Sequence, residues 1–174
     1  KVLEDKTKNL AALTGLAGDD LAYLESRAKE LATQGTESAQ EILDAFTLMG
    51  SAKPELLGNA EALSQTTEAA LTLALASKQD AKTAVESLAA TMNQFGAAAS
   101  ESERYINSPA AGSQAGSAAV SDISKSIVKF GATAANANIS VEESVGLIET
   151  LAEKGIKGEI AGTQLNAVLV KLQV

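Results

Sequence analysis

Apolar side chains recur along the chain three and four residues apart, the spacing of helices that bury one face. This pattern predicts a succession of amphipathic helices. They span residues 2–14, 19–34, 37–49, 60–76, 81–95, 100–107, 120–131, 140–152 and 158–172. The segment 60–76 is apolar on nearly all sides towards its C-terminal end, so we expect it at the centre of the fold.

Short polar residues mark the expected starts of these helices. Thr36 and Asp80 stand where an N-cap residue would precede an apolar run. The sequences Ser100–Glu103 and Ser140–Glu143 have the Ser-x-x-Glu pattern of a capping box. Pro54 opens what we expect to be a single short turn, because proline suits the first position of a helix.

Glycines mark the expected ends. Gly50, Gly96 and Gly131 each follow an apolar run, and glycine readily adopts the left-handed conformation that closes a helix. Residues 108–117 are rich in Ala, Gly and Ser, which predicts an exposed loop or hinge.

The stretch 151–172 predicts a helix end, a tight turn and a new helix. We expect Gly155 and Gly158 to form a structural turn and Gly162 to allow close contact with another backbone. Leu165, Val168, Leu169 and Leu172 are spaced to form one apolar face of the second helix.

The predicted fold class is all-α: a compact array of about seven to nine short-to-medium helices, packed as hairpins, with no sheet. We expect residues 1–174 to form a single domain. Phe95-Gly96-Ala97 and Phe130-Gly131-Ala132 lie 35 residues apart and are both expected to close a helix. A period near 35 residues is typical of stacked helical hairpins, but two copies do not establish a repeat.

The amino-acid composition lacks residue types on which many catalytic and metal sites depend. The chain has no Cys and no His, which excludes disulfides and thiolate metal sites and removes the commonest general base. Acidic pairs occur at residues 19–20, 101–103 and 142–143, all at predicted helix starts, where carboxylates favour the helix dipole. The turn Gly155–Gly158 has one residue too many for a helix-hairpin-helix motif and lacks the Lys-Ser/Thr pair of a phosphate-binding loop. We expect no catalytic residue, no cofactor and no metal.

Charge and hydropathy argue against two kinds of partner, nucleic acids and the interior of a membrane. A net charge of −8 with dispersed basic residues argues against direct nucleic-acid binding. The longest uncharged stretch, Tyr105–Ser121, consists mainly of small and polar residues and does not predict a membrane span. The sequence begins with Lys1 rather than Met, so we expect a fragment of a longer protein or a processed product.

Several stretches, in order, resemble the core region of phage tail tape measure proteins, in the version common in phages and prophages of Bacteroides-like bacteria. The strongest resemblance runs from Leu147 through the Gly155–Gly158 turn to Leu165. The other matching stretches are Gly50–Leu57, Asn93–Gly96, Arg104–Asn107, Ala110–Ser113 and Gly116–Ser117. Two pairs depart from the family pattern, Ser108-Pro109 and Asn166-Ala167.

The resemblance implies a structural, non-enzymatic protein of the virion that acts in tail assembly, tail length determination and genome ejection. The implied location is the tail tube lumen, with the host cytoplasm during assembly. The implied partners are the tail tube protein, tail assembly chaperones and other tail proteins; the oligomeric state is left open.

A segment that sets tail length by its own extended length would need one long helix with an uninterrupted heptad pattern. The frequent helix breaks predicted here do not fit such a segment. We therefore expect a folded module within a longer tape measure chain, docked at one tail end or unfolded for passage through the tube. Two alternatives remain: a cellular helical scaffold with an Ala/Leu groove that binds proteins, and a membrane-active segment at residues 60–76.

Overall fold

The computed structural model describes residues 2–172, which form nine α-helices and no β-strand. The all-α fold class is therefore confirmed for this part of the chain. The α-helices are α1 (Val2–Thr14), α2 (Asp19–Gln34), α3 (Ala39–Ala52), α4 (Ala60–Ser77), α5 (Ala81–Phe95), α6 (Ser102–Ala115), α7 (Val120–Asn136), α8 (Val141–Ala152) and α9 (Gly158–Leu172). Two short 3-10 helices, η1 (Pro54–Leu56) and η2 (Ala99–Glu101), precede α4 and α6.

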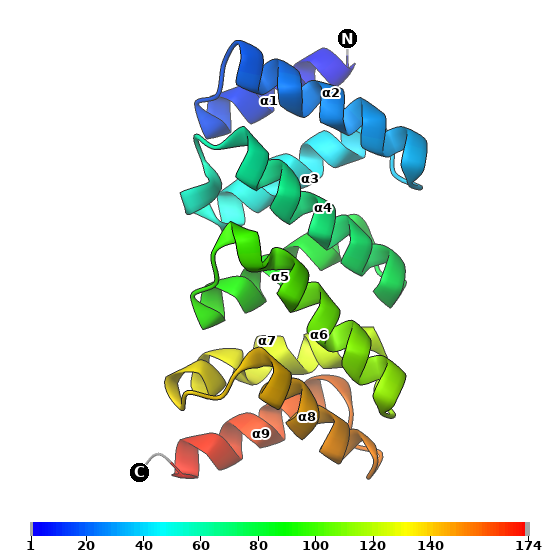
Figure 1. Cartoon of the computed structure of the whole chain (residues 1–174), viewed down its shortest axis with the longest axis vertical. Coiled ribbons are helices and arrows are strands. Elements are labelled where there is room, and N and C mark those ends of the chain that lie inside the picture. Colours follow the sequence, from blue (N-terminus) through cyan, green and yellow to red (C-terminus); the bar gives the residue numbers. More distant parts are fainter. Residues whose placement is uncertain (1, 173–174) are drawn as a thin grey trace.

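The helices form an elongated stack of two layers (Figure 1). Helices α1, α3, α5, α7 and α9 pack on one another in one layer, and α2, α4, α6 and α8 do so in the other. Helices of the first layer begin at residues 2, 39, 81, 120 and 158. A helix pair thus recurs roughly every 40 residues, a length typical of two-helix solenoid repeats.

The two Phe-Gly-Ala sequences, at residues 95–97 and 130–132, do not mark equivalent positions of this repeat. Gly96 ends α5 in a left-handed conformation with φ 65°, as predicted, but Gly131 lies inside α7, which continues to Asn136. The prediction that α7 ends at Gly131 is wrong because this glycine makes room for a neighbouring helix. A methyl group on Gly131 would lie 2.3 Å from Oε1 of Gln94, whose amide donates to the carbonyl of Val128 across α5 and α7.

Helix α3 also differs from its prediction at both ends. Its N-cap is Ser38 rather than Thr36, and Ser38 forms a reciprocal capping box with Glu41. Gly50 does not end α3, which runs to Ala52. A methyl group on Gly50 would lie 3.0 Å from the Leu57 side chain, so this glycine too serves a close contact.

Of the other predicted helix starts, three are confirmed and one is wrong. Pro54 stands at the start of the short turn η1. Asp80 caps α5, and the Ser140–Glu143 capping box opens α8. The predicted Ser100–Glu103 box does not form. Instead, the carboxylate of Glu101 accepts the backbone N–H of Ala98 at 3.1 Å, and the chain turns through η2 before α6 begins.

The loop predicted at residues 108–117 is wrong for most of its length, because α6 continues to Ala115. Pro109 stands inside this helix although it has no N–H to donate. Alanines around it favour the helix, and Pro109 is itself buried. A hinge in this stretch stays a prediction, now in a segment that is largely helical.

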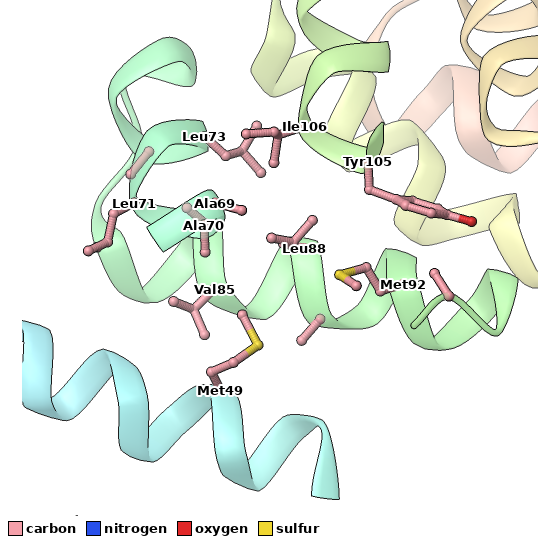
Figure 2. Close-up of a cluster of buried hydrophobic side chains, with 14 of the residues drawn as sticks. Met49, Ala69, Ala70, Leu71, Leu73, Val85, Leu88, Met92, Tyr105 and Ile106 are labelled. Carbon is pink, nitrogen blue, oxygen red and sulfur yellow. The ribbon is translucent and has the colours of Figure 1, made fainter. Parts of the chain in front are cut away.

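The core runs between the two layers along the stack and is built mainly from Ala, Leu, Ile and Val. Figure 2 shows how its middle is formed, with side chains of α3, α4, α5 and α6 converging from both layers. The labelled side chains are Met49, Ala69, Ala70, Leu71, Leu73, Val85, Leu88, Met92, Tyr105 and Ile106. Small side chains keep this core thin.

One lysine is buried in the core. The side chain of Lys53 is 1% exposed, and its amine donates to Oδ1 of Asn93 at 3.0 Å and to the carbonyl of Ala97 at 3.3 Å. It also pairs with the Glu55 carboxylate, and this contact lowers the pKa of Glu55. Asn93 in turn donates to the carbonyl of Ala52 at 2.8 Å. Lys53 therefore joins the C-terminal ends of α3 and α5.

Replacing this lysine should destabilise the stack. We expect Lys53→Met to lower the free energy of unfolding by about 1–3 kcal/mol, because the buried carbonyl of Ala97 and the partly buried Oδ1 of Asn93 lose their donor. The matched control is Lys82→Met, at a lysine side chain that is 74% exposed, where the change should stay within about 0.5 kcal/mol. Urea denaturation measures both. Equal stability of the two variants would contradict a structural role for Lys53.

Candidate functional site

The three glycines predicted to be structural lie at the junction of α8 and α9: Gly155 is in the turn, Gly158 is the first residue of α9, and Gly162 lies within α9. Gly155 has φ 80° and Gly158 has φ 61°, both in the left-handed region that favours glycine. The N–H of Gly155 donates to the carbonyl of Ala152 at 2.9 Å, and the N–H of Ile156 donates to that of Leu151 at 3.0 Å. These bonds satisfy carbonyls at the end of α8 and reverse the chain into α9.

This turn is tied to the preceding repeat by polar contacts. The amine of Lys157 donates to the backbone carbonyl of Ser117, in the turn between α6 and α7. The hydroxyl of the buried Ser126 on α7 donates to the carbonyl of Gly158 at 2.6 Å. The start of α9 is therefore held to α7 at a defined position.

Gly162 brings the backbones of α9 and α7 into contact. A methyl group on Gly162 would lie 2.4 Å from the carbonyl oxygen of Ser126 and 2.8 Å from Cβ of Lys129. Any larger residue would force the two helices apart, because the nearest atom belongs to backbone that cannot rotate away. The contact between α7 and α9 therefore depends on the absence of a side chain at residue 162.

The apolar face predicted for α9 is only half buried. Leu165 and Leu169 pack into the core, whereas Val168 and Leu172 are exposed. The interpretation that the leucines of this face fill the core is therefore wrong for Leu172. The physical reason is that α9 has one neighbour in its own layer, α7, and the side chains of Val168 and Leu172 lie on the open side.

Glu149 of α8 accepts hydrogen bonds from the backbone just before α7. The sequence pattern does not predict this role. The Oε2 atom of Glu149 accepts the backbone N–H groups of Ser117 and Ala118 at 2.7 and 3.1 Å. The N-cap residue of α7 is Ala119, which has no side-chain acceptor of its own. A carboxylate at this end also interacts favourably with the helix dipole. Alanine at the N-cap is the sequence signal that an acceptor for these N–H groups must come from elsewhere in the chain.

Two glycines, Gly112 inside α6 and Gly116 directly after its end, allow α8 to come close, and the sequence analysis does not predict this role. A methyl group on Gly112 would lie 2.3 Å from Cγ1 of Val145, and one on Gly116 would lie 1.9 Å from Oε2 of Glu149. Residues four apart lie on the same helix face. The four-residue spacing of Gly112 and Gly116 could have indicated a helix–helix contact instead of a loop.

An ion pair joins α6 and α8 near the N-terminal ends of both helices. The guanidinium of Arg104 binds both oxygens of Glu142, with Nε to Oε1 at 2.7 Å and a terminal nitrogen to Oε2 at 2.8 Å. Hydrogen bonding by Arg104 lowers the pKa of Glu142 to about 2. Both side chains are nearly half exposed, so solvent screening limits the stabilisation to about 1 kcal/mol or less.

Carboxylates of two of the acidic pairs at predicted helix starts make structural contacts, and Asp19 and Asp20 lie in the first turn of α2. Glu142 binds Arg104, Glu143 completes a capping box, and Glu101 accepts a backbone N–H. Among residues 2–172, no group of three or more potential metal-ligating side chains comes together. In the same range, no helix is both long and apolar enough to cross a membrane. The residues around 149–162 thus form a packing junction between repeats.

The sequence profile of a family described as phage-related minor tail protein matches residues 25–174. The chain is 25% identical over 161 residues to the tape measure protein of Pneumococcus phage Dp-1, covering 92% of this chain and 14% of that protein. It is 28% identical over 173 residues to the probable tape measure protein of Escherichia phage P2, covering 97% of this chain and 20% of that protein. No solved structure matches the chain. The chain thus spans a fifth or less of these relatives' length.

Adding one methyl group at the junction should reveal its close packing. We expect Gly162→Ala to lower the free energy of unfolding by about 1–3 kcal/mol, because α9 must move away from α7. Gly146→Ala is the matched control in α8, where nothing lies within 4 Å of the added methyl group.

In an open helical position, Gly→Ala should raise stability by about 0.5–1 kcal/mol. Opposite signs for the two substitutions in urea denaturation are the expected result. A stabilising Gly162→Ala would show that the two backbones are not in contact.

Proposed function

The chain belongs to the family of phage-related minor tail proteins, and from this premise we propose that residues 1–174 form one folded domain within a longer tape measure protein. The chain is a structural tail component rather than an enzyme. In this proposal the longer protein acts in tail assembly, determines tail length and takes part in genome ejection.

The observation that carries the proposal is that both curated relatives named above are tape measure proteins matched along nearly the whole chain. The structure adds a second argument. The stretches that carry the family resemblance contain Lys53, Asn93, Glu149 and Lys157, and each of these contacts another helix or turn of the stack. Their side chains serve packing, which supports a structural role for the region.

The geometry favours a compact folded domain over an extended helix that measures tail length. A straight helix rises 1.5 Å per residue, so roughly 40 residues would span about 60 Å. In this stack the same residues form one helix pair, and neighbouring packed helices lie only about 8–10 Å apart. A folded repeat therefore adds roughly a sixth of the length that an extended helix would add.

The location and partners follow from the same proposal. The domain occupies the tail tube lumen in the virion and the host cytoplasm during assembly. Its partners are the tail tube protein, tail assembly chaperones and other tail proteins, with no direct contact to nucleic acid. A net charge of −8 suits a channel through which DNA later passes, because like charges repel. The thin core suits a domain that unfolds to travel through the tube.

The alternatives and the host lineage have less support. A helical scaffold of cellular origin relied on the Phe-Gly-Ala echo, which is not the structural repeat. The suggested lineage, phages of Bacteroides-like bacteria, has no support from the relatives named above, which come from phages of other bacteria.

Deleting one repeat tests the compact folded domain against an extended helix that measures tail length. We expect removal of residues 81–119, in the phage that encodes the chain, to shorten the tail by about 10 Å or less, since α7 can stack on α3. A variant with residues 81–119 duplicated controls for local damage and should lengthen the tail by equally little. Electron microscopy of purified virions measures tail length. Changes of about 60 Å in both directions would show that this region is extended and measures length.

A further inference from the structure

The outer face of α9 carries an apolar stripe that no residue of the described chain covers. Ile160, Val168 and Leu172 are 65%, 53% and 75% exposed. Val168 and Leu172 are four residues apart and lie on one side of the helix, next to the buried Leu165 and Leu169, whereas Ile160 lies about 80° further around the helix from them. The stripe therefore widens the core-facing surface of α9 beyond what α7 and α8 cover.

The two ends of the stack differ in this respect. Each inner helix of the first layer packs between two others, whereas α1 and α9 each have one neighbour in that layer. Val2 and Leu13 of α1 are exposed, but its other exposed residues are mainly polar and include an ion pair between Glu4 and Lys8. Solenoids need a polar outer face on their terminal repeats to stay soluble. Helix α1 largely has such a face, and α9 does not.

We propose that the outer face of α9 is an internal repeat interface, covered by a further helix pair of the same polypeptide C-terminal to residue 174. The first helix of this additional pair would pack on α9. This contact would continue the series in which α3 packs on α1, α5 on α3, α7 on α5 and α9 on α7. The relatives are several times longer than this chain, which leaves room for additional repeats.

The proposed occupant has a defined chemistry. It is a helix parallel to α9, in the layer of α1, α3, α5 and α7, with an apolar stripe that meets Ile160, Val168 and Leu172. A second copy of the chain is the competing occupant. The continuing polypeptide is favoured because it repeats an interface that the stack already forms four times in its first layer. This inference does not depend on a role in setting tail length.

Cysteine labelling tests whether the face is covered. The chain has no native cysteine, so Val168→Cys introduces a single reactive thiol in the 174-residue chain. Lys82→Cys is the matched control, at a lysine side chain that is 74% exposed and lies far along the stack on α5. Both variants are made in the 174-residue chain and in the full-length tape measure protein, and maleimide labelling of each peptide is followed by mass spectrometry.

We expect the cysteine at residue 168 to react as fast as the control in the 174-residue chain and about tenfold or more slowly in the full-length protein. Equal rates in both proteins would overturn the proposal, because the face would then be open to solvent. Slow labelling in the 174-residue chain that becomes faster on dilution would also overturn it, since a second copy would then be the occupant.

Discussion

The structure depends on the close approach of neighbouring helices at glycines, which have no side chain at the point of contact. Gly162 meets the backbone of Ser126, and Gly112 and Gly116 admit Val145 and Glu149 of α8. With few aromatic side chains available, the chain gains stability from many short-range contacts instead of a thick core. The same constraint explains why the helices stack in two layers: each helix packs mainly against its nearest neighbours, as in other solenoids.

Polar contacts then fix the position of each repeat on the previous one. Lys53 links the ends of α3 and α5, and Glu149 and Lys157 hold the turn at Ser117. These residues lie in stretches that resemble the tape measure family, so the signature of the family has a physical explanation. It describes the junctions of a stack, and the specificity of the Gly155–Gly158 turn reflects geometry rather than ligand binding.

Sequence periodicity identified the helices well but misjudged several boundaries. Asp80 and Gly96 were assigned correctly because capping is a local interaction. The sequence pattern predicts helix ends at Gly50 and Gly131, although both lie within helices at points where a neighbour comes close. A glycine that closes a helix and one that admits another helix look alike in a single sequence, since the second role is set by residues far along the chain. The helical segment 108–115 and the role of Glu149 were missed for the same reason.

The most direct test of this account is hydrogen exchange on a variant with methyl groups at the contact between α6 and α8. In Gly112→Ala/Gly116→Ala, the account predicts faster amide exchange in α8 and α9, by about tenfold or more, with α1 to α4 as protected as in the parent chain. This follows because each repeat of a solenoid is stabilised by its neighbours. Unchanged exchange in α8 and α9, or an equal acceleration in all nine helices of residues 2–172, would contradict the account.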